Sequence, residues 1–271
     1  METGAERPEA EAAPIGRRQR ASSFGAAAAE YARYRPGYAE AAIRWCLAPV
    51  SNAHPVRVMD LGAGTGILTG ALARLGADVV AVEPDQSMLA ELRRQLPGVR
   101  AVEGSAEALP LPDQSVDAVL CGQAMHWFDL DRALPEIARV LTPGGVLAAL
   151  WNVDDDRVGW VAELAAIAKS KATLSRWRGT PDADAEQDPL SAGSSWFAPA
   201  EEREFGNGRL RSADSLVAAI ATYSRVLVMD EAERARTLAT IRDFLHGQPE
   251  TSAGEFTLPL VTVVLRTVRR P

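Results

Sequence analysis

Apolar residues follow two different spacings along the middle of the chain. Short apolar runs of strand length alternate with stretches in which apolar residues recur every three or four positions, as on one face of a helix. The runs predict strands at 56–61, 78–83, 99–103, 116–121 and 146–151, and the other stretches predict helices at 67–75, 86–95 and 130–141. Near-continuous apolar strands that alternate with helices predict an α/β fold with a mostly parallel sheet and helices on both faces.

This alternation ends after Asn152. A helix at 158–176 and a polar loop at 179–195 are predicted next, and we expect residues 153–200 to form an insertion or lid over the sheet. The remaining pattern consists of a short segment at 201–205, predicted helices at 213–223 and 230–245, and an alternating run at 255–268. We expect that run to be one long strand, paired antiparallel near the end of the sheet.

The N-terminal region has a different composition. Residues 1–22 are rich in Glu, Ala, Pro and Arg, which predicts a disordered tail, and 23–271 are predicted to form a single domain. Helical spacing at 24–35 and 38–47 predicts a helical flap interrupted at Pro36 and Gly37. Arg17 and Arg18 precede no clean apolar core, and no apolar run approaches the length of a membrane span, so we expect a soluble, cytoplasmic protein.

Composition narrows the classes of partner. The net charge of −7 and the lack of a basic stripe argue against nucleic acid, and no membrane partner is expected. Arginine outnumbers lysine by 27 to 2, which is typical of a GC-rich genome and says nothing about phosphate binding. Cys46 and Cys121 lie in apolar runs without zinc-ligand spacing, which predicts buried, reduced thiols and no metal site.

The junction of the first strand and helix carries the chemistry. Asp60 is followed by Gly62, Gly64 and Gly66, and a glycine-rich turn that opens a helix directs free N–H groups at a ligand. A dinucleotide fingerprint needs a sixth-position glycine, which is Ile67 here, and a P-loop needs a lysine, which is absent before Lys169. The turn is therefore of neither type.

What remains, DLGAGTG, resembles the first motif of the class I S-adenosylmethionine-dependent methyltransferases. The resemblance covers about residues 24–152, through VMDLGAGTG, the acid Glu83, the loop GSAEALPLP and the turn LTPGG. QAMHWFD and the leading FGAAAAEYARYRPGY are similar to the small-molecule subgroup that includes trans-aconitate and quinone-pathway methyltransferases. The resemblance implies a Rossmann-like, seven-stranded sheet with an antiparallel last strand, S-adenosylmethionine as cofactor and a small-molecule acceptor.

The same resemblance implies a set of cofactor-binding residues. These are Asp60, Gly62, Ala63, Gly64, Gly66, Glu83, Pro84, Ser105, Ala106, Gln123, Tyr34 and Arg35. Glu83 matches the acid that binds the ribose hydroxyls, a role that suits a carboxylate; the alternative is that it caps the following helix. Asp60 either meets the cofactor ammonium or orients the turn. Ser105 stands where the family usually has Asp, so adenine affinity is in question, although the backbone N–H of Ala106 can still serve the ring.

Acceptor chemistry is less constrained, since methyl transfer depends mainly on alignment in a dry pocket. His126 follows the fourth predicted strand and is the candidate general base; the alternative is a structural histidine packed beside Trp127. Tyr31 and Tyr34 share a helical face with Arg35, which either reaches the cofactor carboxylate or only packs on the sheet. Tyr31, Trp127 and Trp151 are the candidate acceptor-pocket residues, although tryptophans beside strands are commonly core.

Three other functions fit the same residues. One is the same fold binding S-adenosylmethionine for a non-methylating reaction such as cyclisation, and another is a nicotinamide oxidoreductase, which Ile67 disfavours. The third is a non-catalytic binding module. For the methyltransferase we expect a monomer or homodimer, and the acceptor is not fixed by the sequence.

Overall fold

The fold is known from a computed structural model, which describes residues 34–52, 55–170, 172–174 and 195–271. The predicted tail at 1–22, nearly all of the helix at 24–35 and nearly all of the loop at 179–195 lie outside these residues.

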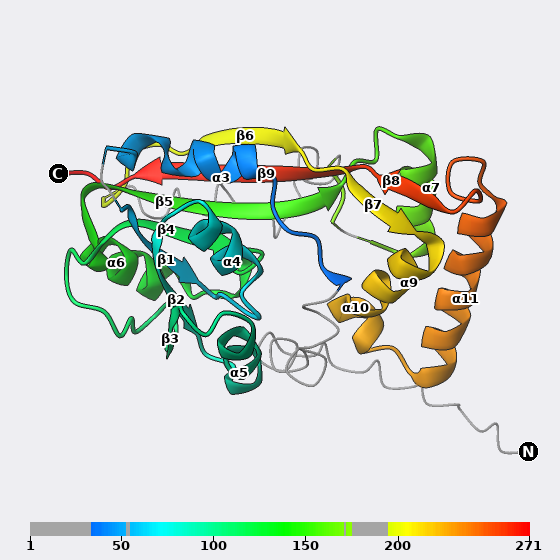
Figure 1. Cartoon of the computed structure of the whole chain (residues 1–271), viewed down its shortest axis with the longest axis horizontal. Coiled ribbons are helices and arrows are strands. Elements are labelled where there is room, and N and C mark those ends of the chain that lie inside the picture. Colours follow the sequence, from blue (N-terminus) through cyan, green and yellow to red (C-terminus); the bar gives the residue numbers. More distant parts are fainter. Residues whose placement is uncertain (1–33, 53–54, 171, 175–194) are drawn as a thin grey trace, which may run out of the picture.

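A seven-stranded sheet forms the centre of the molecule, in the order β3-β2-β1-β4-β5-β9-β6 (Figure 1). Its strands are β1 (Arg57–Leu61), β2 (Asp78–Glu83), β3 (Arg100–Glu103), β4 (Val116–Gly122), β5 (Leu141–Asp154), β6 (Glu201–Gly206) and β9 (Leu260–Val268). Strands β1 to β5 pair in parallel, and β9 is antiparallel to both β5 and β6. The predicted Rossmann-like sheet, mostly parallel with an antiparallel last strand, is confirmed.

Helices cover both faces of this sheet, as predicted. They are α3 (Glu40–Leu47), α4 (Ile67–Arg74), α5 (Gln86–Gln95) and α6 (Leu130–Val140), with short 3-10 turns η2 (Ala48–Val50) and η3 (Met125–Trp127). Ala118 and Leu120 of β4 pack into a cluster with α3 and α4, whereas Val119 and Cys121 pack on the opposite face with α6. Because side chains alternate across the strand and both faces are covered, β4 is apolar from Ala118 to Cys121. Within the described ranges, no helix combines the length and hydropathy needed to span a bilayer.

A second unit lies at one end of the sheet, on the right in Figure 1. It comprises α7 (Gly159–Ile167), β7 (Arg209–Ser212), α9 (Ala213–Ala221), α10 (Ser224–Leu227), α11 (Glu231–Gly247) and β8 (Glu255–Leu258). We call these elements the helical unit. They share an apolar cluster of their own, which includes Trp160, Leu164, Leu216, Ile241 and Phe256. β7 and β8 form a separate two-stranded sheet.

Two predicted elements are wrong in extent. The run at 255–268 is not one strand, because it is divided at Pro259, which has no N–H for a sheet ladder; β8 joins the helical unit and β9 the main sheet. The predicted helix at 158–176 ends at Ile167. Lys169 then adopts a left-handed conformation (φ 49°), and the chain turns so that Thr173 pairs with Asp154 at the end of β5.

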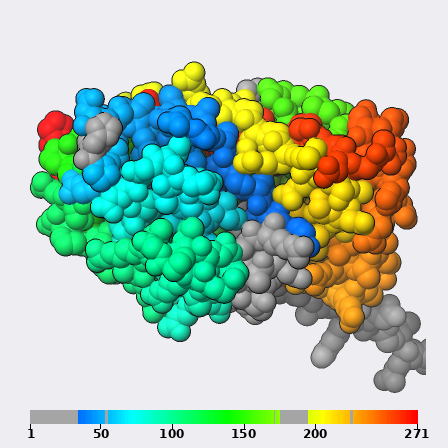
Figure 2. All heavy atoms as spheres, in the orientation of Figure 1, coloured from blue at the N-terminus to red at the C-terminus, as the bar shows by residue number. Residues whose placement is uncertain are grey.

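Asn152 joins the sheet to the segment that leads into α3, residues 34–39, which we call the N-terminal segment. The side-chain Nδ2 of Asn152 donates to the carbonyls of Pro36 and Gly37 at 3.2 Å each. Its Oδ1 accepts from Asn207 at 2.8 Å and from the Thr262 hydroxyl at 2.7 Å. Figure 2 shows the N-terminal segment, in blue, lying between the surfaces of α4 and α9. One buried amide therefore fixes three parts of the chain to each other.

We expect Asn152→Ala to lower the free energy of unfolding by about 2–4 kcal/mol, because it removes the acceptor of the buried Thr262 hydroxyl and one of the two acceptors of the Asn207 amide. Urea denaturation of the purified protein measures this. Asn52→Ala, at an exposed turn, is the matched control and should change stability little. Equal effects of the two substitutions would contradict the role given to Asn152.

Candidate functional site

The glycine turn between β1 and α4 is fixed to the neighbouring strand. The N–H groups of Gly62 and Ala63 donate to the Val82 carbonyl at 2.9 and 3.1 Å. Gly62, Gly64 and Gly66 have φ of 69°, 55° and 90°, a left-handed region that disfavours any residue with a Cβ. A Cβ on Gly62 would also lie 2.6 Å from that of Ala124. The turn therefore requires glycine for its backbone angles and, at Gly62, for its space.

Glu83, at the end of β2, completes the turn. Its carboxylate accepts from the Gly64 N–H at 2.8 Å and from the Asp85 N–H at 2.9 Å. Burial raises the pKa of Glu83, and these two backbone hydrogen bonds partly offset that effect. The helix α5 is capped by Asp85, which accepts from Ser87 and Met88, so capping is not the function of Glu83 here. Its predicted role toward the ribose stays a prediction.

A pocket opens above the turn, at the carboxyl ends of β1 and β4. It is lined by Tyr38, Asp60, Gly62, Ala63, Gly64, Thr65, Ile67, Leu68 and Gly122. Four of the predicted cofactor residues thus share one cavity wall, whereas Tyr38, Thr65 and Gly122 were not predicted to be there. A Cβ on Gly122 would overlap the Tyr38 hydroxyl, so this glycine admits the tyrosine ring. The motif RPGY contains Tyr38 and was the available signal for it.

Two polar atoms in the pocket wall lack a protein partner. The Oδ2 atom of Asp60 accepts from the Thr69 hydroxyl at 2.6 Å, but Oδ1 of Asp60 and the Thr65 hydroxyl are buried without one. Burial raises the pKa of Asp60 to about 7, against the hydrogen bonds from Thr69, and the nearby Glu83 charge adds to the rise. A buried carboxylate and hydroxyl of this kind fit the ammonium and carboxylate groups of an amino acid. These residues suit the amino-acid end of S-adenosylmethionine.

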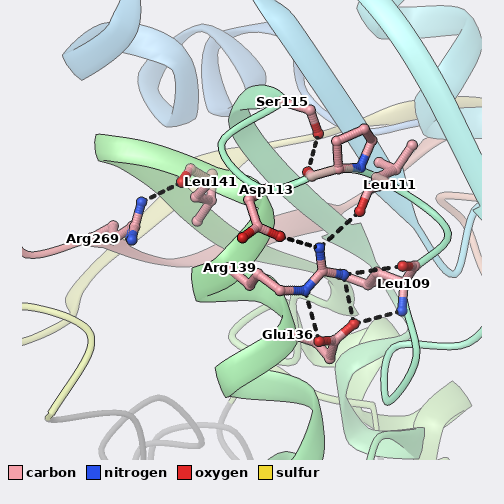
Figure 3. A network of polar contacts seen from close by, with 9 residues as sticks. Leu109, Leu111, Asp113, Ser115, Glu136, Arg139, Leu141 and Arg269 are labelled. Atoms are coloured by element: carbon pink, nitrogen blue, oxygen red, sulfur yellow. Dashed lines mark hydrogen bonds and ion pairs between the residues drawn. The ribbon is translucent and has the colours of Figure 1, made fainter.

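The predicted adenine loop is held in place by α6 (Figure 3). Arg139 donates to the carbonyls of Leu109 and Leu111 at 3.1 and 2.8 Å and pairs with Glu136 and Asp113, each at 2.8 Å. Glu136 in turn accepts from the Leu109 N–H at 2.9 Å. The Arg139 hydrogen bond lowers the pKa of Glu136 to about 2, so this pair stays charged. The sequence did not single out either residue.

Other predicted contacts lie around this loop. Ser105 forms a backbone bridge with Ala108, and Ala106 is buried. Glu107 accepts from the Asp129 N–H at 3.0 Å; burial disfavours its charge, but this bond and others lower its pKa overall. Pro84 is exposed between β2 and α5. The contacts of these residues with a cofactor stay predictions.

The segment after β4 holds the candidate base. Gln123 has a positive φ of 56°, and its side-chain amide donates to the Asn152 carbonyl at 3.0 Å. His126 lies in η3 and is exposed, and its ring is tilted by 45° to that of Trp127 with centroids 4.6 Å apart. Trp151 packs in the main core with 8% of its surface exposed. The catalytic role of His126 and the acceptor roles of both tryptophans stay predictions.

The N-terminal cluster has partners that the sequence did not suggest. The Tyr34 carbonyl accepts from Arg211 at 2.6 Å. Arg35 donates to the Thr222 carbonyl at 3.2 Å, and its guanidinium lies 4.5 Å from the centre of the Tyr223 ring. Arg35 therefore contacts the helical unit, and its reach to a cofactor carboxylate stays a prediction. Tyr31 lies outside the described residues.

We expect Asp60→Asn to stabilise the ligand-free protein relative to wild type as the pH rises from 5 to 8. A carboxyl with a folded pKa of about 7 and an unfolded pKa of about 4 loses stability as pH rises between these values. The asparagine variant does not titrate, so the difference should move in its favour by more than about 1 kcal/mol. Urea denaturation at both pH values tests this, with exposed Asp78→Asn as control. A pH-independent difference would contradict the burial assigned to Asp60.

Comparison with known proteins supports the resemblance to methyltransferases. Residues 59–149 match the family described as a methyltransferase domain. An uncharacterised methyltransferase of Mycobacterium tuberculosis is 40% identical over 251 residues, which cover 92% of this chain and 97% of the relative. A malonyl-[acyl-carrier protein] O-methyltransferase of Methylococcus capsulatus is 46% identical over 100 residues, which cover 35% of this chain and 36% of the relative.

A solved structure extends the match to the fold. The putative type II methyltransferase of Anaeromyxobacter dehalogenans superimposes with a TM-score of 0.56 at 28% identity, covering 87% of this chain and 97% of that one. With the glycine turn, the strand order and a relative matched over nearly its whole length, the chain belongs to the class I S-adenosylmethionine-dependent methyltransferases.

Proposed function

We propose that this methyltransferase acts on a small-molecule metabolite, methylating an oxygen, nitrogen or carbon atom, and that the pocket above the glycine turn binds the methyl donor. The observation that carries the proposal is the pair of unpartnered polar atoms, Asp60 Oδ1 and Thr65 Oγ1, in a pocket walled by glycine backbone. When bound, S-adenosylmethionine supplies a methyl group made electrophilic by its sulfonium.

The chain's own residues bind the methyl donor and orient it. Asp60 and Thr65 hold the amino-acid end, and an ammonium beside Asp60 restores the charged form that burial disfavours. Glu83 accepts from the ribose hydroxyls while it keeps the turn in position. The loop 104–112, braced by Arg139, holds the adenine, with Ser105 and the Ala106 N–H as the polar groups. Pro84, Gln123, Tyr34 and Arg35 complete the proposed set.

The acceptor approaches from the carboxyl ends of β4 and β5. His126 follows β4 and is exposed, so it is the group that removes a proton from a hydroxyl, amine or acidic-carbon acceptor. Trp127, beside it, forms an apolar wall that excludes water, and Trp151 supports that wall from the core. Tyr31, which lies outside the described residues, is the remaining candidate for acceptor binding.

The remaining proposals concern the whole chain. Residues 23–271 act as one methyltransferase domain, with residues 153–200 as the lid over the acceptor. The protein is cytoplasmic and a monomer or homodimer. The net charge of −7 supports a small-molecule acceptor over nucleic acid. Among the relatives, the malonyl-[acyl-carrier protein] O-methyltransferase is named for an acyl acceptor.

Isothermal titration with S-adenosylmethionine tests the cofactor site. Glu83→Ala should raise Kd at least about tenfold, because it removes charge-assisted hydrogen bonds to the ribose and the support of Gly64. Glu103→Ala, an exposed acid paired in register with Glu83 on β3, is the control and should bind as wild type does. No binding by wild type, or equal Kd for wild type and Glu83→Ala, would refute the site.

A screen of a metabolite library for release of S-adenosylhomocysteine identifies the acceptor and separates methyl transfer from a non-methylating reaction. With that acceptor, His126→Ala should lower kcat by about tenfold to a thousandfold with little change in cofactor Kd. An unchanged kcat would return His126 to a structural role beside Trp127.

A further inference from the structure

Two arginines of the helical unit share one face of β7. Arg209 and Arg211 are two residues apart in the strand, so their side chains lie on the same side, opposite the exposed Leu210. Across the ladder they face Leu258 and Phe256 of β8. Leu258 lines a small, mainly apolar cavity that Tyr223 and Asp154 also border. The pair is therefore directed into the molecule.

This pair has no acidic partner among the residues that the structure describes. Arg209 donates to the carbonyls of Gly37 at 2.7 Å and Tyr38 at 3.4 Å, and Arg211 donates to that of Tyr34. The Nε atoms of both are buried without any hydrogen-bond partner. Burial lowers the pKa of each guanidinium, and the charge of Arg211 adds to the effect on Arg209.

Other partly buried arginines in this protein pair with a carboxylate, although the Nε of Arg266 is also buried without a partner. Arg57 pairs with Asp117 at 2.6 Å, Arg139 with Glu136 at 2.8 Å, and Arg266 with Glu201 at 2.7 Å. The chain carries 36 acidic residues against 29 basic ones, so acids are not scarce. Two adjacent, half-buried cations without a carboxylate are costly unless an anion joins them. Nη2 of each arginine already donates to backbone carbonyls, and Nε–H is among the donors that remain for a carboxylate.

Arg209 is joined to the wall of the cofactor pocket by hydrogen bonds. Tyr38 lines that pocket, and its own carbonyl and that of Gly37 are the groups that Arg209 holds. From the other side, Asn207 donates to Asn152, whose carbonyl accepts from Gln123 next to Gly122 in the pocket wall. The arginines thus lie one residue layer beyond the proposed methyl-donor site, at the carboxyl ends of β4 and β5.

We propose that Arg209 and Arg211 bind a carboxylate of the methyl acceptor and so orient it toward the donor. This rests on the proposed function, since it concerns the acceptor of the same site. Both are positioning residues; neither takes part in the transfer of the methyl group. The acceptor class is therefore a carboxylate-bearing metabolite with its nucleophilic atom at a fixed distance from that group.

Arginine Nε–H resonances test the proposal without knowledge of the acceptor. The full chain, ¹⁵N-labelled at arginine and saturated with S-adenosylhomocysteine, is titrated with succinate, with the neutral succinamide, and with phosphate, at constant ionic strength. Arg209→Lys and Arg211→Lys assign the two resonances, and Arg203, exposed on β6, provides the control resonance through Arg203→Lys. Succinate should shift both assigned resonances saturably and succinamide should not.

Three results would overturn the proposal: no shift with succinate, an equal shift with succinamide, or a shift with phosphate alone. Failure to bind S-adenosylhomocysteine would instead count against the proposed cofactor site, so the two failures are distinct. With the acceptor from the screen, Arg209→Gln and Arg211→Gln should each lower kcat/KM about tenfold or more, mainly through KM. Arg203→Gln should match wild type, and the change in acceptor KM should exceed any change in cofactor Kd for both Arg209→Gln and Arg211→Gln.

Discussion

The hydrogen bond from the Gly64 N–H to the Glu83 carboxylate is the constraint on which the site depends. It ties the turn after β1 to the end of β2, and the N–H groups of Gly62 and Ala63 reinforce it through the Val82 carbonyl. A turn with three left-handed glycines has high conformational entropy when free, so such anchors decide its shape. Once it is fixed, the pocket wall is backbone, and Asp60 and Thr65 are left to meet a polar ligand.

The N-terminal segment connects this pocket to the helical unit. Tyr38 lines the pocket, while Pro36 and Gly37 are held by Asn152 from β5 and Gly37 also by Asn207 and Arg209 from the loop and strand after β6. The proposed donor and acceptor sites are therefore built on shared residues. A change in the position of β7 would move the wall of the donor pocket as well.

The sequence was sufficient for elements whose signals are local. Apolar runs located the parallel strands, and the glycines located the ligand-binding turn. The sequence was insufficient where contacts between distant residues determine the structure. The hydrogen bond from Arg209 to Gly37 spans 172 residues, and no spacing rule predicts it. The raised pKa of Asp60 could not be predicted either, because it results from burial in the folded chain. Pro259 was a local signal for the end of β8, but the alternation on both sides of it favoured a single strand.

The position of β9 has a consequence for biosynthesis. Residues 260–268 lie between β5 and β6, and their register with β5 runs from Leu260 opposite Asp154 to Val268 opposite Val146. Until these residues leave the ribosome, β5 keeps an open edge of apolar strand that can pair with another chain. The nascent protein must therefore stay protected until residues 260–268 have left the ribosome, and loss of these residues would leave an aggregation-prone sheet.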